Sequence, residues 1–98
     1  MEVKVKNLIS DKGNVIANQF QIISNKNDYE CSVYFQSYET IIAKVNKRTM
    51  YNDEIILDIH ALNYSRTTSK YLYKFLNMNR KQIENLIKKK EITLKNLN

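Results

Sequence analysis

The sequence contains no proline, no tryptophan, one glycine and one cysteine. Because Cys31 has no second cysteine to pair with, an internal disulfide is excluded, and we interpret Cys31 as a small core or half-buried residue. With so little glycine and proline, the turns must be built mainly from Asn, Asp, Ser and Lys. There is no apolar run of about 18 residues and no signal-peptide pattern, which predicts a cytoplasmic protein that does not enter a membrane.

The signatures of enzymes are also missing. His60 is the single histidine, and no metal-ligand spacing, Gly-rich phosphate loop or Ser-His-Asp set is present. Glu54 and Asp58 share a face if their strand is regular, where they could bind a metal, but a solvated strand edge explains them more simply. The sequence therefore predicts a protein that is not an enzyme and that carries no metal and no cofactor.

The charge is unbalanced, with 16 Lys and Arg against 10 Asp and Glu and a formal charge of +6 in 98 residues. Positive charge favours polyanionic partners such as nucleic acid, an acidic protein face or a membrane surface, and it argues against a mimic of DNA. Small cytosolic proteins are often basic without a specific reason, so charge alone does not choose a partner. The length and a hydrophobic content of 43% are typical of a single globular domain over residues 1–98.

Alternation of apolar and polar residues predicts strands in the first 60 residues. Val3 and Val5 alternate with charged neighbours, the pattern of a strand with one wet face. Turn residues around Gly13 predict a hairpin after this strand. The link from Ser37 to Thr40 lacks glycine and is either a tight turn or a bulge. The predicted strands span residues 2–9, 15–24, 29–37, 40–46 and 54–59.

The last third of the chain changes to helical spacing. Leu72 and Leu76 belong to the apolar side of a helix that begins among the hydroxyl residues 65–69. Asn79 and Gln82 have capping-box spacing, which predicts a second helix, and residues 92–97 either extend it or form an edge strand. The expected fold is α+β: an antiparallel meander of about five strands with two C-terminal helices packed on one face.

Positive charge and hydroxyl groups gather at the start of the first helix. A helix N-terminus carries partial positive charge, and Arg66 and Lys70 add full charge nearby, so this segment could hold an anion such as phosphate. The basic run over residues 80–90 either contacts phosphates or an acidic groove, or forms a solvated helix face. Tyrosine is enriched at interfaces. The residues predicted to contact a partner are Tyr38, Arg48, Tyr64, Arg66, Lys70, Tyr73, Lys74, Arg80, Lys81, Lys88 and Lys89.

The FQSY segment, residues 35–38, allows two interpretations. On a wet sheet face shared with Tyr34, Gln36 and Tyr38 could stack on bases and hydrogen-bond to them. Alternatively, Gln36 and Ser37 satisfy polar groups at an irregular turn and hold the helix against the sheet. We favour the second interpretation.

Three stretches are similar to a known group of proteins: NQFQI (18–22), YFQSYETIIA (34–43) and YSRTTSKYLYKFL (64–76). Together they resemble a family of small, largely uncharacterised proteins from bacteriophages and mobile elements of low-GC Gram-positive bacteria, over roughly residues 15–76. The resemblance implies a phage or prophage origin, a small α+β domain and a location in the bacterial host. It implies no activity. Because short phage proteins of this kind often accompany genes that counter host defence, it suggests an anti-CRISPR role.

Two classes of function follow from these observations. The first hypothesis is a non-catalytic inhibitor, encoded by a phage or mobile element, that binds a host defence protein and specifically a Cas nuclease. The second is a stand-alone nucleic-acid-binding protein whose basic residues contact phosphates. An exposed edge strand over residues 2–9 would also make a dimer easy to form.

Overall fold

The computed structural model describes residues 2–98. Its strands are β1 (Glu2–Ile9), β2 (Val15–Asn25), β3 (Glu30–Ser37), β4 (Thr40–Arg48), β5 (Glu54–Asp58) and β6 (Ile92–Lys95). Its helices are the short 3-10 helix η1 (Ala61–Asn63) and the α-helices α1 (Arg66–Leu76) and α2 (Arg80–Lys88). None of these helices is long and apolar enough to cross a membrane.

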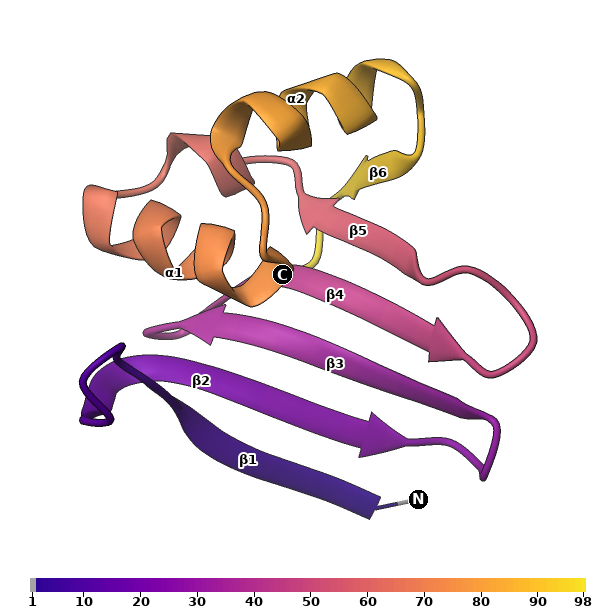
Figure 1. Ribbon diagram of the computed structural model, residues 1–98, viewed down its shortest axis with the longest axis horizontal. Helices are drawn as coiled ribbons and strands as arrows, with labels where there is room; N and C mark the ends of the chain where they lie inside the picture. Colours follow the sequence, from indigo (N-terminus) through magenta and orange to yellow (C-terminus); the bar gives the residue numbers. More distant parts are fainter. Residues whose placement is uncertain (1) are drawn as a thin grey trace.

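The strands form one sheet in chain order, β1 to β6 (Figure 1). The first five are antiparallel neighbours, and β6 returns after the two helices to pair with β5 in parallel. The predicted α+β fold with a meander and two C-terminal helices is confirmed, with six strands in place of about five. Residues 92–95 form an edge strand because Ile92 then pairs with Ile55 and is only 2% exposed.

The core lies between the helices and one face of the sheet. Val33 and Phe35 of β3 are buried on this face, and the Phe35 ring stacks on Phe75 of α1 with centroids 5.7 Å apart. Leu72 of α1 and Ile83 of α2 have no exposed surface. Each of these side chains gains about 1.5–3 kcal/mol from burial, which makes this layer the main source of stability. Cys31 is a free, half-buried residue, as predicted.

The predicted turns and caps are also present. Gly13 has a φ of 83° in the β1–β2 hairpin, a conformation that glycine adopts without strain. Ser65 caps α1 by accepting a hydrogen bond from the Thr68 N–H, and Asn77 ends the helix in the left-handed conformation. Asn79 and Gln82 form the expected capping box of α2.

The β3–β4 connection is a tight turn combined with a bulge. Ser37 pairs with Thr40, so Tyr38 and Glu39 alone make the turn, and the register shifts near Ile42. Tyr38 has a φ of 55°, which costs a bulky residue about 1–3 kcal/mol. The expectation that Tyr38 shares a sheet face with Tyr34 is therefore wrong, because a turn does not follow strand alternation.

Asp58, at the end of β5, is buried and accepts four hydrogen bonds. One carboxylate oxygen accepts from the Leu97 N–H (3.0 Å) and the Asn98 amide (3.2 Å), and the other accepts from the His60 N–H and the Tyr64 hydroxyl (both 3.1 Å). Burial raises the pKa of Asp58, but these hydrogen bonds outweigh it and hold the pKa below its ordinary value of 3.8. The expectation that Asp58 lies on a solvated strand edge is wrong, since it is 2% exposed.

We predict that Asp58→Asn lowers the free energy of unfolding by about 2–3 kcal/mol, because the new amide nitrogen would face hydrogen-bond donors. Asp53→Asn, in the exposed β4–β5 loop, is the control and should change it by less than about 0.5 kcal/mol. A carboxyl with a depressed folded-state pKa stabilises the protein above its unfolded-state pKa. Urea unfolding from pH 7 to pH 3 should therefore show the wild type approaching Asp58→Asn as the pH falls below about 4. A constant difference over this range would contradict the assignment.

Candidate binding surface on the helical layer

The surplus positive charge belongs to the helical layer, defined here as residues 66–90. This segment holds eight of the 16 Lys and Arg residues and one of the 10 acidic residues, Glu84. The remainder of the chain holds eight basic and nine acidic residues and is close to neutral. The formal charge of +6 is therefore concentrated on the side of the sheet that carries α1 and α2.

An open groove of about 670 Å³ lies on this layer, between η1, α1 and the start of α2. It is lined by Leu62, Tyr64, Arg66, Thr67, Ser69, Lys70, Tyr73 and Arg80. Arg66, Lys70 and Tyr73 share one face of α1 because they stand four and three residues apart. Five of the predicted contact residues thus come together here, and we call this set of lining residues the cationic groove.

Arg80 links η1 to α2 at the groove. Its guanidinium donates to the Leu62 carbonyl of η1 (3.2 Å) and pairs with Glu84 one turn along α2 (3.5 Å). The side chain is about half exposed, so the remaining N–H donors face solvent. Arg80 therefore supplies positive charge to the groove from a fixed position.

The Tyr64 hydroxyl is hydrogen-bonded to Asp58. Its hydroxyl donates to the carboxylate at 3.1 Å, and burial, together with this bond and the nearby negative charge, raises the pKa of Tyr64. The phenol consequently stays neutral at physiological pH. Its half-buried ring lines the groove beside Arg66, where it offers an apolar and aromatic contact surface.

The hydroxyl residues at the start of α1 divide into two groups. Thr68 is 5% exposed, and its hydroxyl bonds to that of Ser37 in β3 at 2.8 Å and to that of Ser65 at 3.2 Å. These contacts cap the helix and fix it to the sheet. Thr67 and Ser69 instead line the cationic groove, where their hydroxyls are available to a partner.

The structural interpretation of FQSY is confirmed. The Gln36 side chain donates to the Tyr38 carbonyl (2.6 Å) within the tight turn, and Ser37 holds Thr68 of α1. Neighbouring Gln19 of β2, which pairs with Ser37, is fully buried, and its side-chain amide has no hydrogen-bond partner. Ser37 therefore joins the sheet to the helix, and Gln36 holds the turn.

Lys74 lies one turn beyond the groove and is already engaged. Its ammonium donates to the Ile9 carbonyl (2.6 Å) and pairs with the Asp11 carboxylate (3.0 Å), so it ties α1 to the β1–β2 hairpin. The hydrogen bond and charge of Lys74 lower the pKa of Asp11. The structure gives Lys74 a role in holding the hairpin, which its sequence context did not suggest.

The other predicted contact residues lie outside the cationic groove. Arg48 is at the end of β4, where its guanidinium lies 5.4 Å from the Tyr51 ring centroid and donates to Asn52. Tyr38 is 56% exposed in the β3–β4 turn. Lys81, Lys88 and Lys89 are exposed on α2 or at its end.

Sequence reasoning missed Leu62 as a groove residue, and it named Thr67 and Ser69 only as members of the hydroxyl cluster at the helix start. Thr67 and Ser69 carried a signal, since they flank Thr68 in the hydroxyl cluster, but only the structure separates the buried Thr68 from the two residues that line the groove. No such signal exists in the sequence for Leu62, because the three-residue helix η1 has no periodic pattern of its own. Within residues 2–98, no three His, Cys, Asp or Glu side chains come together as a metal site.

We predict that Thr68→Val lowers the free energy of unfolding by about 1–3 kcal/mol, because the buried Ser37 hydroxyl loses its partner. Thr67→Val, one residue away and exposed, is the matched control and should change stability by less than about 0.5 kcal/mol. Urea denaturation monitored by far-UV circular dichroism measures both. Equal effects of the two substitutions would refute the docking role of Thr68.

Comparison with known proteins adds a family and no function. No curated protein and no solved structure matches the chain. One family model matches residues 3–94. This range contains both α-helices and all six strands, except Glu2 at the start of β1 and Lys95 at the end of β6. The chain therefore belongs to DUF8033, a family of unknown function.

Proposed function

We propose that the protein is a non-catalytic inhibitor, encoded by a phage or mobile element, that binds a host defence protein, and that a Cas nuclease is its target. The observation that carries the binding role is the cationic groove, in which Arg66, Lys70 and Arg80 stand beside Tyr64 and Tyr73. Arg and Tyr are the residue types that contribute most often to binding energy at protein interfaces.

The charge of the groove limits what it can contact on such a target. The nucleic-acid channels of a nuclease are themselves basic, and a protein of charge +6 would be repelled from them. The partner surface is therefore an acidic or neutral domain, or the nucleic acid that the nuclease holds. Where the partner surface is acidic or is the nucleic acid, association is steered by charge and weakens as salt rises.

The phage origin is supported by the three sequence stretches of the resemblance. In the fold these stretches meet: the Tyr38 N–H donates to the Asn18 carbonyl (2.7 Å), and Ser37 bonds to Thr68 (2.8 Å). They therefore form one structural unit, which explains why they occur together. The groove residues Arg66, Lys70 and Tyr73 lie within or beside the third stretch.

We predict that the protein blocks plasmid cleavage by the CRISPR nuclease of its host, and that Arg66→Ala combined with Lys70→Ala weakens this inhibition by about 10- to 100-fold without unfolding the domain. Lys12→Ala with Lys95→Ala removes the same charge outside the helical layer and is the control. Inhibitor titrations in a cleavage assay, with circular dichroism of each variant, measure these effects. Full cleavage at saturating wild-type protein would refute the choice of target, and equal losses in both double variants would refute the groove.

A second function, stand-alone nucleic-acid binding, is favoured by the same concentration of charge in residues 66–90. Arg66 and Lys70 in the groove would contact phosphates, and Tyr73 would stack on an unpaired base. Arg48 and Lys74 also belonged to the predicted phosphate contacts, but Lys74 is paired with Asp11.

For this second function we predict binding to labelled single- or double-stranded DNA that weakens steeply between about 50 mM and 200 mM salt, because each phosphate contact releases counterions. Fluorescence anisotropy at both salt concentrations measures it. Lack of binding at the lower salt concentration would remove nucleic acid as a direct partner and leave a protein target.

A further inference from the structure

The outer edge of β1 is a long strand edge without a neighbour. β1 stands at one end of the strand order, and β2 is its single partner in the part of the chain that the structure describes (Figure 1). Glu2–Asn7 pairs with Phe20–Asn25 in six consecutive pairs. Beyond this segment the register shifts, and the Ile9 carbonyl accepts a hydrogen bond from Lys74. Residues 2–7 therefore present a regular row of backbone N–H and C=O groups to solvent.

The opposite edge of the sheet, at β6, is protected in two ways. β6 has four residues, and a very short edge strand is a poor template for pairing. The chain then returns to β5 and β4, where Leu97 donates to Asp58 (3.0 Å). Asn98 exchanges two hydrogen bonds with Ile41 (2.8 and 2.9 Å). β1 has neither protection, since it has eight residues, and the chain contains no proline that would interrupt it.

The side chains of β1 alternate between two kinds of surface. The strand register puts Lys6 in the row of Phe35, on the side of the sheet that carries the helices. Lys4 shares that side, because alternate residues of a strand face the same way. Val3 and Val5 face the other side, where they are 58% and 61% exposed. The edge strand thus offers ammonium groups along one side and apolar surface along the other.

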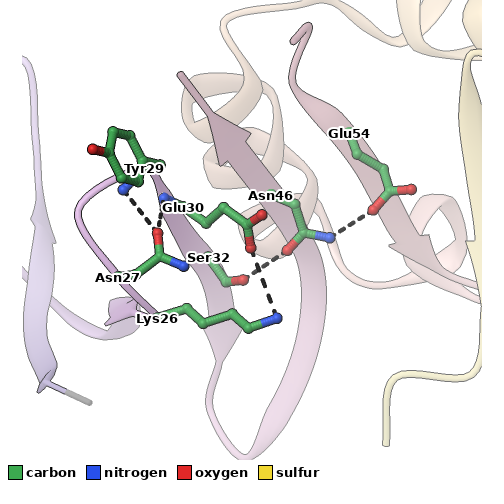
Figure 2. A network of polar contacts seen from close by, with 7 residues as sticks. All are labelled: Lys26, Asn27, Tyr29, Glu30, Ser32, Asn46 and Glu54. Carbon is green, nitrogen blue, oxygen red and sulfur yellow. Dashed lines mark hydrogen bonds and ion pairs between the residues drawn. The ribbon is translucent and has the colours of Figure 1, made fainter. Parts of the chain in front are cut away.

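Within residues 2–98, neither lysine of β1 takes part in an ion pair. The strands β2–β5 contain three acidic residues, and each is already engaged. Glu30 pairs with Lys26 of the β2–β3 turn (3.8 Å), and Glu54 accepts from the Asn46 amide (2.7 Å), as Figure 2 shows. Asp58 accepts four hydrogen bonds. The carboxylates of these strands therefore leave the charge of the β1 lysines without a partner.

Charge decides which kind of strand fits this edge. A second β1 laid against the first would bring Lys4 and Lys6 of the two copies together, and like charges on facing strands destabilise the pairing. Acidic residues opposite these lysines would stabilise it, and the formal charge of +6 attracts an acidic partner. Apolar residues opposite Val3 and Val5 would remove exposed apolar surface from water. The strand that matches β1 therefore alternates acidic and apolar residues.

We propose that the outer edge of β1 binds an extended segment of a partner protein in which acidic and apolar residues alternate, and that this segment adds a strand to the sheet. Its carboxylates lie along the side of Lys4 and Lys6, and its apolar side chains along the side of Val3 and Val5. Backbone hydrogen bonds to residues 2–7 provide affinity, and the alternation provides specificity. This contact is separate from the cationic groove and does not depend on the proposed function.

Amide hydrogen exchange in the presence of a peptide probe tests the proposal. The probe is a synthetic peptide of about six residues in which glutamate alternates with valine, and its control has the same composition with the glutamates grouped at one end. NMR on the full chain should show that the alternating peptide slows exchange of the outward N–H groups in residues 2–7 at least about tenfold, because new hydrogen bonds protect them. The grouped peptide should bind at least about tenfold more weakly.

A charge reversal tests the match between side chains. Lys4→Glu combined with Lys6→Glu should weaken binding of the glutamate–valine peptide at least about tenfold and create binding of the corresponding lysine–valine peptide. Lys12→Glu combined with Lys95→Glu changes the net charge equally outside β1 and is the matched control, which should retain the wild-type affinity within about threefold. Circular dichroism confirms that each variant is folded.

Three results would overturn the proposal: unchanged exchange in residues 2–7 at every peptide concentration, equal binding of the two glutamate peptides, or equal losses of affinity in the two double variants. Slowed exchange in residues 2–7 that depends on the concentration of the protein and not on the peptide would also overturn it, and would assign the β1 edge to a second copy of the chain.

Discussion

The arrangement of the molecule depends on how the N-terminal end of α1 is fixed to the sheet. Two polar contacts do this: Thr68 bonds to Ser37 of β3 in a buried position, and Tyr64 bonds to Asp58 of β5 in a half-buried one. Buried polar groups are costly when unpaired, so contacts of this kind allow few alternative positions for the helix. The groove residues project from the same helical turns, and their positions follow from this anchorage.

The charge of the molecule is unevenly distributed. The helical layer concentrates the positive charge around a groove, while the remainder of the chain is close to neutral. A charged groove favours fast, salt-sensitive association with an acidic partner.

The segments 18–22, 34–43 and 64–76 are mostly architectural. Asn18 and Tyr38, both with positive φ, are joined by a backbone hydrogen bond, and Ser37 and Thr68 connect sheet and helix. Two left-handed non-glycine residues in contact are uncommon, and the surrounding hydrogen bonds are what hold them.

The sequence by itself determined the local structure, because strand alternation, capping residues and turn residues act over a few positions. It separated Val33 and Phe35 from Tyr34, and it placed the capping box at Asn79. Only the tertiary structure decided that residues 92–95 become β6, since the free edge of β5 is what gives this short segment its hydrogen bonds. It also decided that Lys74 is paired, Asp58 buried and Arg80 part of the groove. Asp58 and Tyr64 are 6 residues apart in sequence, Arg80 and Leu62 are 18 apart, and Lys74 bonds to Asp11 and Ile9 at separations of 63 and 65 residues. Local sequence patterns do not encode contacts over such separations.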